Sequence, residues 1–132
     1  MVASKPRAQI SPSLEDYLEA VLVLAGDDEG VRTTDIAARL GVAKASVNQA
    51  MGLLVDHGLI MREKYGPVYL TEDGQNAARA VCKRHRAIKS FLISVLGVDE
   101  TVAEEDACQI EHVVSKETMT GMIDFMEREA DR

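Results

Sequence analysis

The chain has 132 residues, of which 46% are hydrophobic and only 4% aromatic, so its core must be aliphatic and wholesale disorder is excluded. No run approaches the 18 consecutive apolar residues of a membrane-spanning helix, and residues 1–13 contain no apolar signal segment. Two cysteines are too few for a disulfide framework. We therefore expect a cytoplasmic protein with no membrane partner.

The net charge of −7 is unevenly distributed along the chain. Residues 1–90 contain 12 Lys and Arg against 11 Asp and Glu, whereas residues 91–132 contain 3 against 11. The acidity therefore belongs to the C-terminal third. The first two-thirds are close to neutral and can present a local basic face to phosphates.

The first part of the chain predicts a helix, a loop and a second, shorter helix. Ser13, followed three residues later by Asp16, has the pattern of a capping box, and apolar residues continue from there at helical spacing to residue 25. A loop is expected over 26–30. Thr33 or Thr34 is expected to cap the short second helix.

A third helix and a hairpin follow. The third helix is expected over 43–56 and should end near Gly58, which suits a left-handed cap. Two short strands are expected over 59–63 and 68–71, joined by a turn at 65–67. The residues of the third helix expected to face inward are Val47, Ala50, Met51, Leu54 and Val55.

Residues 34–47 have the anatomy of a helix-turn-helix motif. A small residue, Ala37, falls where the two helices would cross, Gly41 permits the sharp turn, and Val47 can pack back onto the first helix. With the hairpin behind it, the segment predicts a winged helix. Two alternatives stay open: a plain three-helix packing unit with solvated polar residues, and a winged helix that binds protein.

The exposed side of this motif offers a set of short, amide and basic side chains that suit DNA. A glutamine can pair with adenine in the major groove, an alanine can touch a thymine methyl group, and a lysine suits a phosphate. The turn of the expected hairpin, which is the tip of the wing in a winged helix, could reach the neighbouring DNA backbone. The candidate DNA-binding residues are Thr34, Ala43, Lys44, Ala45, Ser46, Asn48, Gln49, Arg62, Lys64 and Tyr65.

The second part of the chain predicts three more helices. A long helix is expected from residue 71 to Leu96, stopped by Gly97; Asp99 should cap a fifth helix reaching about residue 114, and Ser115 a sixth. The fold class is therefore mainly α: a flexible tail over 1–12, a winged-helix domain with a small β-hairpin over 13–71, and a helical domain over 72–132.

The expected fifth helix contains a group of potential metal ligands. Cys108, Glu111 and His112 are spaced i, i+3 and i+4, which places them on one helical face. Thiolate, carboxylate and imidazole together suit a borderline transition ion rather than Mg²⁺ or Ca²⁺. The alternative is a half-buried cysteine beside a surface Glu–His pair.

Other residues of ligand type lie elsewhere. Asp16 and Glu19 form an acidic i, i+3 pair on the first helix. His85 lies among cationic neighbours, which disfavours a charged imidazole and suits a neutral ligand. Cys82 has no partner at ligand spacing and is interpreted as a core residue or a partly buried thiol.

Five segments in this order resemble the DtxR/MntR family of metal-dependent repressors: 13–19, the winged helix, 84–86, 96–99 and 108–115. The resemblance covers residues 13 to about 127. It implies a homodimer that binds double-stranded operator DNA when loaded with metal, and the short, two-domain manganese-type architecture, in which residues 72–132 form the metal-binding and dimerisation domain. Self-association is then expected through the apolar residues Phe91, Leu92, Val95, Met119, Met122 and Ile123. It also implies the metal ligands Asp16, Glu19, His85, Cys108, Glu111 and His112.

The ligand set combines features of two subtypes. Asp16 and Glu19 match the manganese-type pattern, whereas a cysteine at Cys108 matches the iron type. Lys89 replaces a glutamate and Glu104 stands where a histidine is common, so an iron-type ancillary site is not expected. A second site using Glu19 and His85, with Glu111 shared, stays open. Fe(II) or Mn(II) is the expected metal, with Zn(II) or Co(II) possible.

The expected mechanism is linkage: one ion held by both domains would fasten the first helix to the fifth and so space two recognition helices across a dimer. No small organic ligand is expected. Three rivals remain. One is a metal-independent winged-helix regulator that senses a small molecule. Another is a di-metal enzyme, although the chain contains no Glu-x-x-His motif. The last is a dimerisation or adaptor module.

Overall fold

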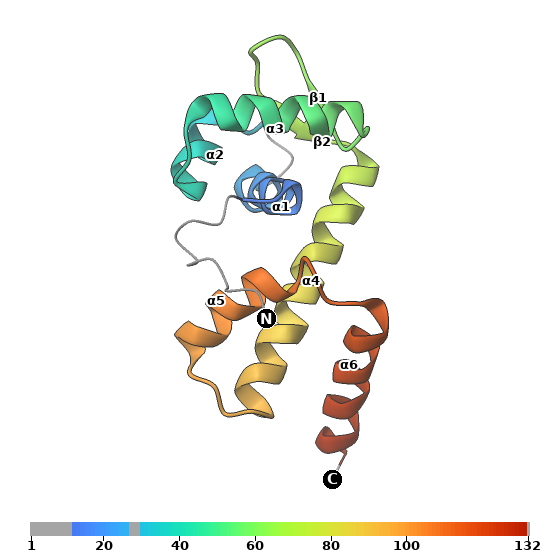
Figure 1. The fold of residues 1–132 in the computed structure, drawn as a ribbon. Coiled ribbons are helices and arrows are strands. Elements are labelled where there is room, and N and C mark those ends of the chain that lie inside the picture. The colour runs from blue at the N-terminus through green and yellow to red at the C-terminus, as the bar shows by residue number, and fades with distance from the viewer. Residues whose placement is uncertain (1–11, 27–29, 132) are drawn as a thin grey trace, which may run out of the picture. The chain divides into compact units, whose positions relative to one another are not determined.

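A computed structural model describes residues 12–26 and 30–131 (Figure 1). The expected tail therefore lies outside the described residues except for Pro12, as does the middle of the loop at 26–30. The protein is mainly α, as predicted, and forms two compact units, Met1–Ala77 and Ala78–Arg132. The elements are α1 (Leu14–Ala25), α2 (Thr33–Leu40), α3 (Lys44–Asp56), β1 (Ile60–Arg62), β2 (Val68–Leu70), α4 (Glu72–Ser94), α5 (Glu100–Ile110) and α6 (Lys116–Ala130).

The start of α1 is the predicted capping box. Ser13 Oγ accepts a hydrogen bond from the Asp16 backbone N–H at 3.2 Å, and Asp16 Oδ2 accepts one from the Ser13 N–H at 2.8 Å. These two bonds satisfy donors that the first turn of a helix leaves open. The helix then buries Tyr17, Leu18 and Val21 in the N-terminal unit.

The helix-turn-helix geometry is confirmed, but its first cap is not. Arg32 occupies the N-cap of α2 without a side-chain hydrogen bond, so the expected cap by Thr33 or Thr34 is wrong. Thr33 is instead a buried helical residue. At the other end, Gly41 ends α2 in the left-handed conformation (φ 66°), which favours glycine and allows the sharp turn into α3.

The third helix buries a narrower face than the sequence predicts. Val47, Ala50, Met51 and Leu54 are buried together, whereas the Val55 side chain is 42% exposed. Val55 follows Leu54 directly and is therefore turned by about 100° away from that face. The helices α1, α2 and α3 pack against one another around this face.

The hairpin carries an additional short pairing that the sequence did not indicate. In the antiparallel pair, Ile60 lies opposite Leu70 and Arg62 opposite Val68. Val31 then pairs with the outer side of Val68 through two backbone hydrogen bonds of 2.8 Å. A single residue preceding α2 gives no period-two pattern, so this pairing leaves no signal in the sequence.

The C-terminal unit has its own aliphatic core between α4, α5 and α6. Its buried residues are Ile88, Leu92, Ala103, Ala107 and Met119. Two of these are alanines on α5, whose small side chains allow close helix packing. Leu92 and Met119 were expected on a surface for self-association; burial within the chain corrects that expectation, because their side chains are already covered.

The fifth helix is shorter than predicted. Asp99 caps it and Ser115 caps α6, as expected. However, α5 ends at Ile110 and does not reach residue 114. The backbone N–H groups of His112 and Val113 bond to carbonyls three residues earlier, at 3.4 and 3.0 Å, which tightens the chain into a turn. Among the described residues, no helix has the length and apolar composition needed to cross a membrane.

Candidate metal centre and nucleic-acid interface

Glu111 is the centre of a polar cluster in the C-terminal unit. Its side chain is only 1% exposed. One carboxylate oxygen, Oε2, lies 2.8 Å from His85 Nδ1, and the other, Oε1, lies 3.4 Å from His112 Nε2. The backbone carbonyl of Glu111 accepts a hydrogen bond from Arg84 Nε at 3.1 Å. The carboxylate is thus held between two imidazole rings.

A thiol completes this cluster. Cys108 Sγ lies 3.8 Å from His85 Nδ1, and both residues are half-buried. Cys108 belongs to α5, whereas Glu111 is the C-cap of that helix and His112 lies in the turn behind it. The sequence predicted that these three residues share one regular helical face. They lie instead at the end of a helix and in the turn that follows it. A helix C-terminus carries partial negative charge, which favours a cation there.

The donor atoms of this cluster fit a transition metal ion. A buried carboxylate costs free energy unless a positive charge or hydrogen bonds compensate it. Sulfur, nitrogen and carboxylate oxygen together form a donor set of intermediate softness. His85, Cys108, Glu111 and His112 are thus four of the six residues that the sequence singles out as ligands, and they belong to one unit.

The carboxylates around His85 govern its protonation. Burial alone would lower the pKa of His85, but the hydrogen bonds and negative charges of Glu104 and Glu111 outweigh burial and raise it. Both ring nitrogens face carboxylates, which favours the charged imidazolium in the metal-free protein. This differs from the sequence interpretation, in which cationic neighbours along the chain favour a neutral ring.

Glu104 is a potential ligand that sequence reasoning did not include. Its Oε1 lies 3.0 Å from His85 Nε2, and one donor atom each from His85, Glu104 and Cys108 lies within 4.8 Å of the others. Burial alone would raise the pKa of Glu104, but hydrogen bonds from His85 and Lys89 lower it. Glu104 precedes Cys108 by four residues, so helical spacing could have identified it.

The remaining two predicted ligands, Asp16 and Glu19, lie on α1 of the N-terminal unit. Asp16 Oδ2 already serves the capping box, so this residue has a structural role of its own. Glu19 Oε2 is buried without a hydrogen-bond partner among the described residues. A buried carboxylate oxygen without a partner is costly and is stabilised by a cation or a proton.

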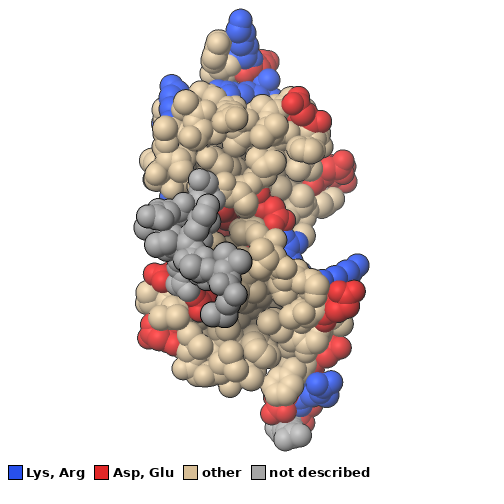
Figure 2. Space-filling view, in the orientation of Figure 1, with Lys and Arg blue, Asp and Glu red and all other residues tan. Residues whose placement is uncertain are grey.

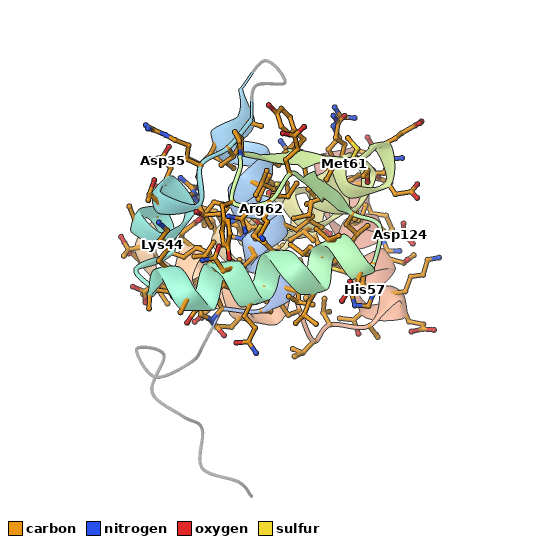
Figure 3. The ribbon with its side chains drawn as sticks, turned by 90° about the horizontal axis from the view of Figure 1, so that it is seen from above. Asp35, Lys44, His57, Met61, Arg62 and Asp124 are labelled. Carbon is orange, nitrogen blue, oxygen red and sulfur yellow. The ribbon has the colours of Figure 1, made fainter. Side chains whose placement is uncertain are left out.

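Six of the predicted DNA-binding residues lie on α2, directly before α3 or in its first turns. The side chains of Ala43, Lys44, Ala45, Ser46 and Gln49 are exposed, as is Thr34 on α2. Figure 3 shows Lys44 at the beginning of α3 and His57 just beyond its end. This face is therefore accessible and carries the amide, hydroxyl and cationic groups that groove recognition uses.

Two of the predicted DNA contacts are bonded to each other. Arg62 Nη1 donates to Asn48 Oδ1 at 2.9 Å, and Arg62 Nε donates to the Gly66 carbonyl at 3.0 Å. Figure 3 shows Arg62 between the hairpin and α3. Arg62 thus links the hairpin, which forms the wing, to α3.

The wing tip is the most exposed part of the hairpin. The Tyr65 side chain is 82% exposed, and its backbone adopts a positive φ of 59° at the turn. Lys64 Nζ lies 5.7 Å from the centre of the Tyr65 ring. Figure 2 shows lysine and arginine side chains gathered around the wing loop, whereas acidic side chains are conspicuous over the C-terminal unit.

A winged helix with an accessible recognition helix, followed by a helical unit with a cluster of thiol, carboxylate and imidazole groups, defines a DNA-binding protein that can respond to a metal ion. Comparison with known proteins agrees. Residues 9–68 match the N-terminal DNA binding domain of the iron dependent repressor family, and residues 71–130 match its metal binding and dimerisation domain. The chain belongs to this family of metal-dependent transcriptional repressors, which are not enzymes.

Individual relatives cover most of the chain. It is 35% identical over 124 residues to an uncharacterised HTH-type transcriptional regulator of Methanocaldococcus jannaschii, covering 93% of this chain and 99% of the relative. It is 34% identical over 115 residues to the transcriptional regulator MntR of Salmonella typhimurium, covering 87% and 73%.

Solved structures show the same fold. The manganese regulator SloR superposes with a TM-score of 0.79 at 28% identity, covering 89% of this chain and 55% of that one. A manganese-dependent transcriptional repressor complex with manganese gives a TM-score of 0.75 at 30% identity, covering 83% and 50%. The chain thus spans about half the length of these solved structures.

Proposed function

We propose that this chain is a cytoplasmic repressor of metal-homeostasis genes that binds operator DNA as a homodimer when loaded with Fe(II) or Mn(II). The observation that carries the proposal is the buried Glu111 carboxylate, held between His85 and His112 with Cys108 beside it. An ordinary winged-helix protein has no need to gather these four groups around a buried carboxylate.

The proposed ligands are Asp16, Glu19, His85, Cys108, Glu111 and His112. A bound divalent ion supplies the positive charge that the acidic members of this set require. Without metal, the neighbouring carboxylates of Glu104 and Glu111 favour a protonated His85 ring. The ring must lose a proton before one of its nitrogens can bind a metal ion. The donor chemistry of the C-terminal residues and the buried oxygen of Glu19 support the set; the inclusion of Asp16 rests on the family resemblance.

Metal and operator are proposed to act on the same two-state equilibrium. If the DNA-competent arrangement holds the metal more tightly, operator affinity increases with metal, and DNA increases metal affinity by the same factor. The Cys108 thiolate favours Fe(II), Co(II) or Zn(II), whereas the carboxylates suit Mn(II). Relatives solved with manganese and with Zn²⁺ are compatible with either preference.

For DNA, we propose that Gln49 reads a base edge and that Lys44 and the wing residues contact the backbone.

For the dimer, we propose an apolar surface on α4 and α6 built around Phe91 and Phe125. Their rings pack edge to face with centroids 6.2 Å apart, and Phe125 is 36% exposed. A hollow of about 590 Å³ next to them is lined by Ser90, Ser94, Val95, Phe125, Met126, Glu129 and Ala130.

The test is operator binding by fluorescence anisotropy under anaerobic conditions, with chelator and then with Mn(II), Fe(II), Co(II) and Zn(II) in turn. We expect weak binding in chelator and much tighter binding with at least one of these ions. Glu111→Gln should remove this response, whereas Glu117→Gln, at an exposed position of the same unit, should keep it. Binding that ignores chelation would favour the alternative, a metal-independent regulator that senses a small molecule.

A further inference from the structure

The side of His85 away from Glu111 is occupied by a small charged network. His85 Nε2 lies 3.0 Å from Glu104 Oε1, and Lys89 Nζ lies 3.0 Å from the other oxygen of that carboxylate, Oε2. Lys89 Nζ also lies 3.6 Å from Glu100 Oε1. Lys89 follows His85 by four residues on α4, and Glu104 follows Glu100 by four residues on α5, so helical spacing aligns the two rows.

This network occupies donors that could otherwise hold an ion. One donor atom each of His85, Glu104 and Cys108 lies within 4.8 Å of the others, which is the spacing of a metal-ligand group. The lysine ammonium is a compact positive charge placed on the same carboxylate that an ion would need. A cation bound there would have to displace the ammonium group and would be repelled by its charge.

We propose that Lys89 is a tethered cation that takes the place of a metal ion on the Glu104 side of His85. It keeps that side closed to metal and holds Glu104 as the acceptor for His85 Nε2–H. The other ring nitrogen, Nδ1, then faces Glu111 and Cys108, as expected of a metal-binding histidine oriented by a carboxylate on its outer nitrogen. The inference rests on the proposed metal response and adds the residue that limits how many ions each subunit takes.

The test is to exchange the cation for a donor and count ions. Lys89→Glu would place a new carboxylate beside Glu104 and Glu100, which supplies oxygen ligands without the protonated His85 Nε2. We expect the variant to bind one more Co(II) per subunit than the wild type. The count is made by equilibrium dialysis followed by elemental analysis. Lys83→Glu makes the same charge change at an exposed position of the same helix and should leave the count unchanged.

A second substitution locates the additional ion. Adding Glu104→Gln to Lys89→Glu should return the count to the wild-type value. An unchanged count in Lys89→Glu, or an equal gain in Lys83→Glu, would overturn the proposal. So would retention of the additional ion in the double variant.

A milder variant covers the case in which Lys89→Glu fails to fold. Lys89→Gln removes the charge without adding a carboxylate, and it should raise the affinity for an additional Mn(II) by about tenfold, measured by electron paramagnetic resonance of free Mn(II). Unchanged affinity would contradict the proposal. Failure here is distinguishable from failure of the proposed function, because the metal response of operator binding is measured separately in the wild-type protein.

Discussion

Cys108 is the residue that separates a site with a thiolate ligand from one built only of carboxylates and imidazoles. A Co(II)–thiolate bond gives a near-ultraviolet charge-transfer absorption band. We expect wild-type protein loaded with Co(II) to show this band and Cys108→Ser to lose it. Cys82→Ser should keep the band, because Cys82 is not among the proposed ligands. Neither cysteine forms a disulfide and both are half-buried, so the two variants are well matched.

The same variants test metal preference. Replacing sulfur by oxygen exchanges a soft donor for a hard one, so Cys108→Ser should lose more affinity for Co(II) or Zn(II) than for Mn(II). Loss of the band in Cys82→Ser, or its survival in both variants, would show that Cys108 is not a ligand. The site would then consist of Asp16, Glu19, His85, Glu111 and His112.

Two exposed residues on α3 should contribute to DNA binding in different ways. Gln49→Ala is expected to weaken operator binding by roughly 1–3 kcal/mol and to relax sequence preference, because a base contact is lost. Lys44→Ala should weaken all sequences about equally and reduce the salt slope by about 1, because a phosphate contact is lost. Both are measured by anisotropy titrations with operator and scrambled DNA at several salt concentrations.

A lysine outside the winged helix provides the control. Lys116→Ala, at an exposed position on α6, removes the same charge and should leave affinity and salt slope unchanged. If Gln49→Ala binds operator and scrambled DNA with the wild-type ratio, the base contact is assigned to the wrong residue.

At the scale of elements, the junction between α3, the hairpin and α4 depends on Gly74. A Cβ added at this position would overlap the backbone carbonyl of Leu59. Thr71 joins the same junction: its Oγ1 donates to the Gly58 carbonyl at 2.7 Å and accepts from the Gly74 N–H at 3.0 Å. The close approach of α4 to the backbone is therefore fixed by a residue without a side chain.

This junction makes a stability prediction. Gly74→Ala should lower the free energy of unfolding by about 1–3 kcal/mol or more, because neither the helix nor the Leu59 carbonyl can give way easily. Gly52→Ala, inside α3 with open space around the added Cβ, should raise it by up to about 1 kcal/mol, because alanine favours the helix. Urea denaturation followed by circular dichroism measures both. Equal effects of the two substitutions would contradict the close approach.

The early end of α5 has a functional consequence at the same scale. Because the helix stops at Ile110, Glu111 and His112 lie in the turn, where the carboxylate can meet both imidazoles. Ile110 and Val114 both pack against the core of the C-terminal unit, which holds the turn in place. The candidate metal cluster is therefore supported by apolar residues on both sides of the turn.

At the scale of the whole molecule, self-association should depend on the C-terminal unit. Phe125→Asp is expected to weaken the dimer at least about tenfold, because a charge would be buried in an apolar interface. Val23→Asp makes the same kind of change at a residue of α1 that is 49% exposed and should leave the dimer intact. Sedimentation velocity with and without metal measures both variants.

The wild-type protein should sediment as a dimer in either condition. If the protein is a monomer in chelator, the metal controls assembly of the dimer and not the arrangement of the domains within it. A dimer unaffected by Phe125→Asp would place the interface on another surface of the chain.

The sequence alone determined the class of fold, the order of the elements and the helix-turn-helix segment. Local rules suffice for these features: Ser13 and Asp16 satisfy one another's backbone donors, Gly41 adopts the conformation that its turn requires, and apolar residues recur at the helical period. The ligand-type residues of the C-terminal unit were also visible, because Cys108, Glu111 and His112 are neighbours along the chain.

Only the tertiary structure decided what depends on contacts between distant residues. It ended α5 early and placed Leu92 and Met119 in the core of their own unit. It also brought Asn48 to Arg62, and Glu104 to both His85 and Lys89. Spacing along one helix cannot show which side chain of another helix will face it, because that depends on how the two helices pack. For this reason the family resemblance indicated only that Lys89 replaces a glutamate. The structure shows that its ammonium group contacts Glu104.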